Sequence, residues 1–253
     1  MTFNIKHSKL IRDLFTMPSF PIIATIACIA YGIESIFGFG GTIIFLGLSG
    51  IFFDFNSLLK LAMIVGLSSG LAVLIQSYKH LSWRHLVKIL AYTIPGALVG
   101  TLLISSITSE WLIKFFALLL IVYACFNLFL PNLLIPGILK KALVILGGFI
   151  QGVYTIGGPF VLMGYKDHFS SKQELRSTMA GYFFIINSLR VIFYILLGGS
   201  YLEIVSTYYP IVFMVMISVW LGYLVHRKIS EVLFKKLIII AILFIGIIIL
   251  VTK

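Results

Sequence analysis

The sequence predicts an all-α integral membrane protein, built as an inverted-topology internal repeat with glycine-broken half-helices. Sixty per cent of the 253 residues are hydrophobic and only 11% are charged. Apolar segments recur along the chain with short connections, and glycine pairs interrupt them at corresponding places in the two halves. A helix needs about 20 apolar residues to cross about 30 Å of hydrocarbon. A soluble domain of this length does not need so much apolar surface, so we expect several spans.

Two of the apolar segments, 42–53 and 159–165, are too short to cross a bilayer, and each follows a glycine pair. This pattern is typical of a helix, a break at membrane depth and a half-helix. We therefore expect eight spanning helices plus two half-helices, preceded by a basic segment at 1–18. The first membrane repeat covers 19–130 and the second 131–253. The apolar segments lie at 19–37, 42–53, 57–78, 86–105, 111–130, 138–156, 159–165, 177–198, 204–224 and 232–251.

The two halves resemble each other in sequence. Moving the chain by 117 residues places the first glycine pair on the second and Glu34 on Gln151. Moving it by 121 residues places the segment 109–114 on the segment 230–235, and a longer loop at 166–173 accounts for the difference. These two matches at nearly one offset predict an internal duplication.

The distribution of basic residues predicts that the two repeats are inverted. The loop 104–110 carries no Lys or Arg, whereas the equivalent loop 225–231 carries His226, Arg227 and Lys228. Since basic loops stay in the cytoplasm, equivalent loops lie on opposite faces. The net charge of +11 follows from the same rule, and the bases form no patch of the kind that binds nucleic acid. The basic residues within 1–18 disagree with strict inversion, so the side of the N-terminus stays open.

Two charged residues, Glu34 and Arg190, lie deep inside apolar segments. A charge at mid-membrane costs roughly 2.5 to 3.5 kcal/mol on insertion scales, so it persists where it pairs, faces water or functions. We expect Arg190 to be the counter-charge for an anion; the alternative is a structural arginine bonded to backbone carbonyls near a helix break. We expect Glu34 to couple protons or gate the substrate; the alternative is a protonated glutamate hydrogen-bonded to a neighbouring helix.

The glycine breaks are the predicted substrate site. Glycine permits the turns and close backbone approach that a break at membrane depth requires. Each following half-helix starts with free N–H groups and the positive end of its dipole, so two such starts meeting near the midplane would bind an anion. The alternative is that these glycines only allow close helix packing, as we expect for Gly66 with Gly70 and Gly96 with Gly100. The candidate substrate-binding residues are Gly38, Gly40, Gly41, Thr42, Gln151, Thr155, Gly157, Gly158, Pro159, Asn187 and Arg190.

One motif suggests an enzyme and is rejected. Residues 47–50 read Gly-Leu-Ser-Gly, the nucleophile pattern of rhomboid intramembrane proteases. A serine nucleophile needs a base within hydrogen-bond reach, and every histidine lies in a loop or at a helix end. Cys28 and Cys125 lie inside apolar segments without metal-type spacing. We predict no catalytic residue, no metal site and no cofactor.

Several short motifs occur together in a characteristic order. They are the first glycine break, Leu81-Ser82-Trp83, the Pro95–Gly100 segment, Ser109-Glu110, the glycines at 148, 152 and 157–158, and Arg176-Ser177-Thr178. With this order and spacing, the chain resembles the TauE/SafE family of sulfite and sulfonate exporters, also called the toluene-sulfonate uptake permease superfamily. It departs from the family in lacking a proline within 42–50.

The resemblance implies a carrier of small sulfur-containing anions such as sulfite, thiosulfate or organosulfonates, in a bacterial-type inner membrane. We therefore predict a multi-pass permease, an exporter or ion-coupled carrier, working by alternating access around a midplane site. The alternatives are a passive anion channel and a non-transporting membrane assembly factor. The expected partners are a small anionic solute and the lipid bilayer, without nucleic acid, and a homodimer is left open.

Overall fold

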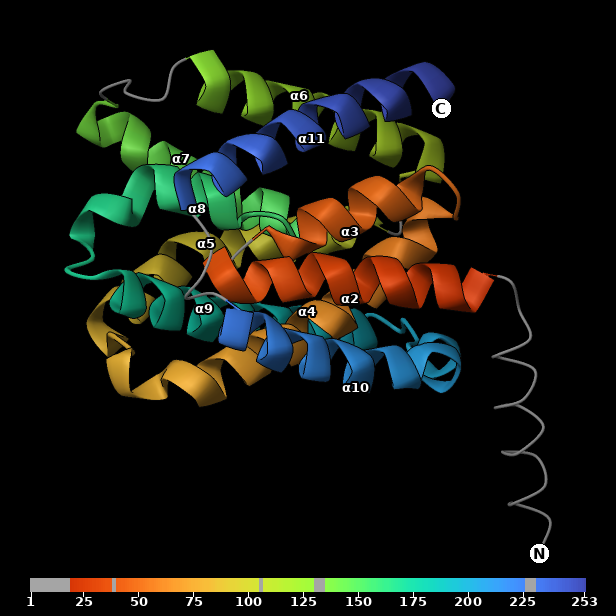
Figure 1. The fold of residues 1–253 in the computed structure, drawn as a ribbon, viewed down its shortest axis with the longest axis horizontal. Coiled ribbons are helices and arrows are strands. Elements are labelled where there is room, and N and C mark those ends of the chain that lie inside the picture. Colours follow the sequence, from red (N-terminus) through yellow and green to blue (C-terminus); the bar gives the residue numbers. More distant parts are fainter. Residues whose placement is uncertain (1–18, 38–39, 105–106, 130–134, 226–230) are drawn as a thin grey trace, which may run out of the picture.

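The structure is a computed structural model that describes residues 19–37, 40–104, 107–129, 135–225 and 231–253. Every element among them is helical (Figure 1), which confirms the predicted all-α fold. The basic segment 1–18 lies outside the described residues. The α-helices are α2 Ser19–Phe37, α3 Gly41–Gly50, α4 Phe55–Ser77, α5 Trp83–Ile104, α6 Ser109–Phe129, α7 Gly137–Tyr154, α8 Gly158–Tyr165, α9 Lys172–Leu196, α10 Leu202–Val225 and α11 Glu231–Thr252, with short 3-10 helices η1 Tyr78–His80 and η2 Lys166–His168.

The helix lengths are those of a multi-pass membrane protein. Within the described residues, six helices are long and apolar enough to cross a membrane: α4, α5, α6, α7, α9 and α10. The apolar stretches found in α2 and α11 are shorter, so the expected total of eight spans stays a prediction. The helices α3 and α8 have 10 and 8 residues. At 1.5 Å per residue they cover about 15 and 12 Å, which is half of a hydrocarbon core or less.

Apolar side chains also cover the outside of the molecule. One stripe on α10 has residues spaced three and four apart, so they share one helix face. Its members are all more than half exposed to solvent, and a patch of this kind requires an apolar environment such as lipid. They are Phe213, Ile217, Trp220, Leu221 and Leu224.

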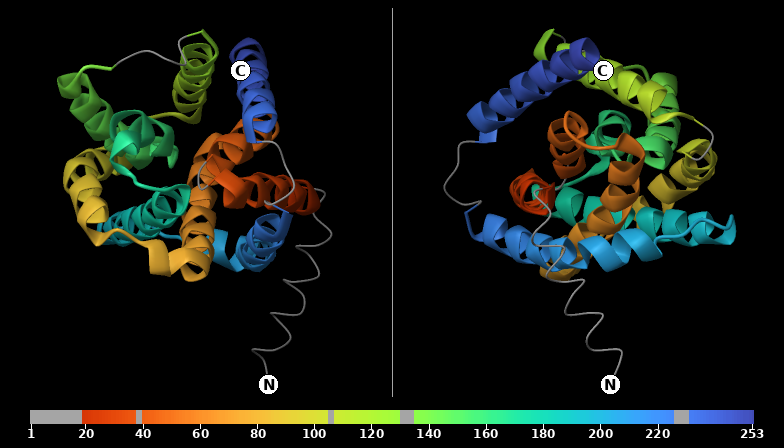
Figure 2. Two further views of the ribbon diagram at one scale, coloured as in Figure 1. Left: turned by 60° about the vertical axis from the view of Figure 1, so that its left-hand side comes forward. Right: turned by 90° about the vertical axis from the view of Figure 1, so that its right-hand side faces the viewer.

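The helix pairs are reciprocal between the two halves of the chain. Helix α2 packs on α10, and α7 packs on α5; helix α4 packs on α9, and α6 on α11. In the left view of Figure 2, α5 and α7 lie on one side and α2 and α10 on the other. If α2–α6 correspond to α7–α11, each of these four pairs maps onto its counterpart or onto itself. Two halves related by a two-fold axis would produce this pairing.

The central pair, α4 and α9, runs antiparallel. Near the end of α4, the Ser177 hydroxyl donates a hydrogen bond of 2.8 Å to the Ser77 carbonyl. In the middle of α4, Gly66 lies against Asn187, where an added Cβ would stand 3.2 Å from the side-chain nitrogen. Because α4 and α9 hold equivalent positions in the proposed repeat, opposite directions are what an inverted repeat requires. The orientation of the halves across a membrane stays a prediction.

Glycines bring α5 and α7 into backbone contact. A Cβ added at Gly96 would stand 2.8 Å from the Phe149 amide nitrogen, and one at Gly100 would stand 2.5 Å from the Phe149 carbonyl oxygen. From the opposite helix, a Cβ at Gly152 would collide with the Ala97 carbonyl. The packing role predicted for Gly96 and Gly100 is therefore confirmed, and it is the close approach of small residues common between membrane helices.

The helix that follows each half-helix has a side-chain cap. Asp54 caps α4 by accepting a 2.8 Å hydrogen bond from the Ser57 amide. Its other carboxylate oxygen accepts a 2.8 Å hydrogen bond from the hydroxyl of Ser109, which begins α6. Partial burial alone would raise the pKa of Asp54, but these hydrogen bonds outweigh it and hold the pKa below its ordinary value. Ser171 caps α9 by accepting a 3.1 Å hydrogen bond from the Glu174 amide. These caps fix where the long helices start relative to the half-helices.

Candidate functional site

Each half-helix begins at a turn with a left-handed residue. Gly40 precedes α3 with φ +99°, a conformation that glycine adopts without steric cost. Thr155 ends α7 with φ 62°, where a side chain is uncommon. Its amide donates a 2.9 Å hydrogen bond to the Gln151 carbonyl, which closes the last turn of α7. Both breaks predicted from the glycines are present; Gly38 lies outside the described residues.

Glu34 and Gln151 perform the same structural task in the two halves. One Glu34 oxygen accepts a 2.9 Å hydrogen bond from the Gly41 amide across the break, and the other accepts a 2.8 Å bond from the Ser69 hydroxyl on α4. The Gln151 oxygen accepts a 2.8 Å bond from the Gly157 amide, and its nitrogen donates to Asn187 on α9 at 3.0 Å. Each side chain therefore joins the helix before the break to the amide after it and to the next long helix.

The amides of Gly41 and Gly157 are thus occupied by the chain itself. We expected free amides at both half-helix starts, and these two are hydrogen-bonded to Glu34 and Gln151. The α3 start faces a carboxyl group of the chain, which suits the positive end of a helix dipole. At the α8 start, the amides of Gly158 and Phe160 lie in the first turn, where no intrahelical acceptor exists.

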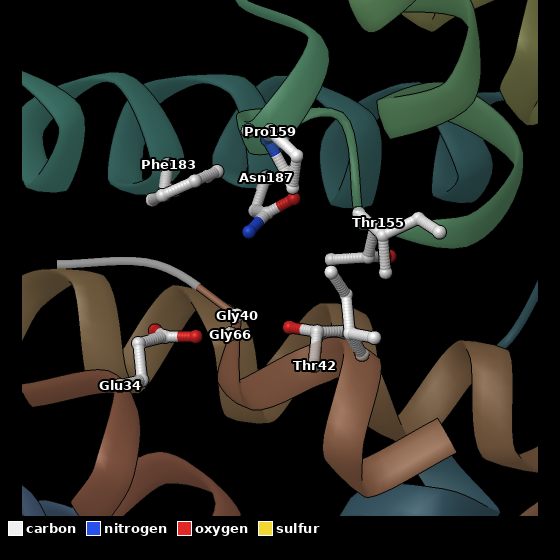
Figure 3. Close-up of a pocket in the computed structure, with 11 residues that line it drawn as sticks. Glu34, Gly40, Thr42, Gly66, Thr155, Pro159, Phe183 and Asn187 are labelled. Carbon is white, nitrogen blue, oxygen red and sulfur yellow. The ribbon is translucent and has the colours of Figure 1, made fainter. Parts of the chain in front are cut away.

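The two breaks face each other across one narrow pocket. In Figure 3, Glu34, Gly40 and Thr42 lie on one side of the space, and Asn187, Pro159 and Phe183 on the other. The lining residues come from α2, both breaks, both half-helices, α4 and α9. They are Glu34, Gly40, Thr42, Ile43, Gly66, Thr155, Ile156, Gly158, Pro159, Phe183 and Asn187.

The pocket includes some of the predicted substrate-binding residues and leaves others outside its wall. Gly41, Gly157 and Gln151 hold the breaks together behind it. Gly66 lines the pocket, although its sequence context indicated helix packing alone. Phe183 was missed because a phenylalanine in an apolar segment carries no distinguishing signal; a Cβ added at Gly158 would stand 2.5 Å from its ring.

Hydrogen bonds fix the orientation of the Asn187 amide. Its oxygen accepts from the Gln151 nitrogen at 3.0 Å and from an Arg190 nitrogen at 3.1 Å. Because both partners can only donate at these atoms, the oxygen and nitrogen of Asn187 cannot exchange places. The Asn187 nitrogen is therefore directed into the pocket, toward the side that carries Glu34 and Gly40 (Figure 3). The second half thus presents a hydrogen-bond donor to a solute.

Arg190 is fully buried and does not line the pocket. Its guanidinium donates to Thr101 at 3.2 Å, to Thr155 at 2.9 Å and to Asn187 at 3.1 Å, and also to the Gly152 carbonyl. Two of these partners, Thr155 and Asn187, line the pocket. The positive charge therefore lies behind the residues that line the pocket. This is the alternative of a structural arginine bonded near a helix break. Direct contact between Arg190 and a solute stays a prediction.

The protease-like motif has no catalytic partner in the described part of the chain. Ser49 is fully buried, and its hydroxyl has no hydrogen-bond partner there. His85 and His168 lie together with Tyr165 and Phe169, and His85 pairs with Glu174 at 3.3 Å. A serine hydroxyl without an adjacent base is not an activated nucleophile.

Comparison with known proteins gives one match. The family model described as Sulfite exporter TauE/SafE matches residues 23–249, which include both breaks and every residue that lines the pocket. No curated protein and no solved structure matches the chain. The match covers nearly the whole chain and confirms the resemblance that the sequence motifs indicated.

Proposed function

The chain belongs to the Sulfite exporter TauE/SafE family, and from this premise we propose that it carries a small sulfur-containing oxyanion, such as sulfite, thiosulfate or an organosulfonate, by alternating access around the pocket between the two breaks. The family makes it a multi-pass membrane permease of the exporter type. The particular anion and the mechanism are the proposal. We also propose a bacterial-type inner membrane as its location, and a homodimer stays open.

The observation that carries this proposal is the pocket lined by both half-helix starts. A permease needs a site where the two halves meet, since one half then moves against the other around it. In this conformation the pocket has space for about one water molecule, so binding of a small oxyanion requires the two halves to move apart around it. On one side, the fixed Asn187 nitrogen and the α8 start offer donors and a positive dipole end.

Glu34 is the proposed proton carrier. It is 7% exposed and lines the pocket opposite Asn187. An ionised carboxylate would repel an anion across so small a space, whereas a protonated Glu34 would not. One proton and one anion would therefore occupy the pocket together, and release of the proton would favour release of the anion.

Flux measurements in proteoliposomes test this function. We expect saturable sulfite flux with counterflow, meaning that unlabelled sulfite on one side drives labelled sulfite across from the other. Flux that rises linearly with concentration and shows no counterflow would favour a passive channel. If the protein moves no anion from a panel of sulfite, thiosulfate, sulfate, taurine and carboxylates, the proposal of a carrier is refuted. That result would support the alternative of a non-transporting membrane assembly factor.

The variant Asn187→Asp ties the flux to the pocket. An aspartate keeps one oxygen for Gln151 and Arg190 but turns an acceptor, not a donor, toward the solute. We expect the protein to fold and sulfite flux to fall at least about tenfold, the usual cost of losing a hydrogen bond to a charged partner. Asn127→Asp is the matched control, since the Asn127 nitrogen donates a hydrogen bond within its own helix, to the Tyr123 carbonyl, and Asn127 does not line the pocket. Equal flux in both variants would refute the assignment of the pocket.

A further inference from the structure

An arginine whose Nε has no acceptor in the described part of the chain lies where α4 ends and α9 begins. Arg176, in the first turns of α9, donates a 3.1 Å hydrogen bond from one terminal nitrogen to the side-chain oxygen of Gln76 on α4. Its guanidinium carbon lies 4.7 Å from the ring centre of Tyr223 on α10. Three helices therefore hold this guanidinium in place.

Two buried donors at this point have no acceptor in the described part of the chain. They are the Nε of Arg176 and the Nε2 of Gln76. Because the Gln76 oxygen accepts from Arg176, the amide cannot turn over to offer its oxygen in place of its nitrogen. Buried polar groups are nearly always hydrogen-bonded, and two adjacent exceptions call for a missing acceptor.

The nearest acid in sequence does not neutralise Arg176. One oxygen of Glu174 accepts a 2.8 Å hydrogen bond from the Ser170 amide, and the other pairs with His85. No ion pair of Arg176 occurs among the side chains that the structure describes, which do not include those of Glu203 and Glu231. A partly buried guanidinium beside a second unused donor, without a carboxylate, is the arrangement that binds an oxyanion with two acceptor oxygens.

We propose that Arg176 and Gln76 form a second oxyanion site, separate from the central pocket. Arg176 is 11 residues from Asn187 along α9, and Gln76 is 10 residues from Gly66 along α4, so the site lies about 15 Å from the pocket along the helix axes. The basic loops 78–88 and 166–176 adjoin it, at the face predicted to be cytoplasmic. Its ligand is either a free oxyanion approaching the pocket or the phosphate of a lipid headgroup.

Direct binding tests the site without depending on transport. The full chain is purified in detergent, stripped of lipid, and titrated by calorimetry with sulfite in one arm and short-chain phosphatidylglycerol in the other. The Asn187→Asp change is present in every sample, so that the central pocket, where we expect this change to weaken binding at least about tenfold, contributes little. We expect binding in at least one arm, and we expect Arg176→Gln to weaken it at least about tenfold, as for hydrogen bonds to charged groups.

Three further variants separate binding from folding. Lys79→Gln removes one exposed positive charge at the same end, and it should bind within about twofold of the parent. Gln76→Met removes the second donor and should weaken binding. Gln76→Glu places a carboxylate beside Arg176; it should abolish binding and leave the melting temperature equal or higher, which shows an intact fold.

The outcomes distinguish this site from the proposed function. Sulfite binding lost in Arg176→Gln assigns the site to a free oxyanion, and phosphatidylglycerol binding lost in that variant assigns it to lipid. Binding in neither arm, or equal loss in Arg176→Gln and Lys79→Gln, overturns the proposal. If the parent chain transports no anion in proteoliposomes but binding still depends on Arg176, the proposed carrier function is refuted and the proposed second site is retained.

Discussion

Replacing Glu34 by glutamine removes one ionisable group from the pocket and keeps its shape. The new amide oxygen accepts from the Gly41 amide as the carboxylate does, and the new nitrogen faces the Ser69 hydroxyl. That hydroxyl accepts the new bond and donates to the Gly66 carbonyl, which is already 3.4 Å away. No buried group loses its partner, so we expect the free energy of unfolding to change by about 1 kcal/mol or less. Gln151 already holds its break in this way.

The effect on coupling is large by comparison. A gradient of one pH unit supplies about 1.4 kcal/mol per proton, which is a tenfold ratio of concentrations. If one proton moves with one sulfite monoanion through Glu34, proteoliposomes with such a gradient accumulate sulfite until its concentrations on the two sides differ about tenfold. Glu34→Gln should retain counterflow but only equilibrate sulfite. The control Glu110→Gln removes an exposed carboxylate that pairs with Lys114, and it should accumulate sulfite as the parent does. Accumulation by Glu34→Gln equal to the parent would refute the coupling role.

Two further variants test the structure around the site through thermal melting in detergent. Gly157→Ala places a methyl group against the Gly147 carbonyl and should destabilise the protein by about 3 kcal/mol or prevent folding. The control Gly137→Ala adds its methyl group in open space and should change stability by less than about 0.5 kcal/mol. Equal melting temperatures of the two variants would contradict the packing of the break. Asp54→Ala removes the α4 cap and should cost about 1 kcal/mol at pH 7. The folded pKa of Asp54 is below its ordinary value, so the stabilisation by the ionised cap is lost as the pH falls and the carboxylate protonates. The difference in the free energy of unfolding between the parent and Asp54→Ala should therefore become smaller below about pH 4. A difference that does not change with pH would contradict the cap.

The pattern of helices could be predicted from the sequence because it depends on local apolarity and glycine. The segment 57–78 is found as α4 Phe55–Ser77, and the segment 159–165 as α8 Gly158–Tyr165. The segment 42–53 was extended too far, since Phe52 and Phe53 continue the apolar run, whereas α3 ends at Gly50. The chain has to turn there so that Asp54 can cap α4.

The partners of the polar side chains could not be predicted, because they depend on how distant helices pack. Glu34 bonds Ser69 across 35 residues of sequence, and Gln151 bonds Asn187 across 36. A charge inside an apolar run indicates that some partner exists. The sequence does not distinguish a solute from the chain itself as that partner, and for Arg190 the structure supplies Thr101, Thr155, Asn187 and Gly152.

The proposed coupling follows from a difference between the two halves. Both breaks are closed by a side chain from the preceding helix, but Glu34 brings an ionisable carboxyl group and Gln151 a neutral amide. A monoanion within about 5 Å of an ionised carboxylate is repelled by about 3 kcal/mol at an effective dielectric constant of about 20. A proton on Glu34 removes this repulsion, so the anion should bind beside Asn187 mainly when Glu34 is protonated. A pocket with glutamine in both halves would bind the anion without a proton, and Glu34→Gln would create that pocket.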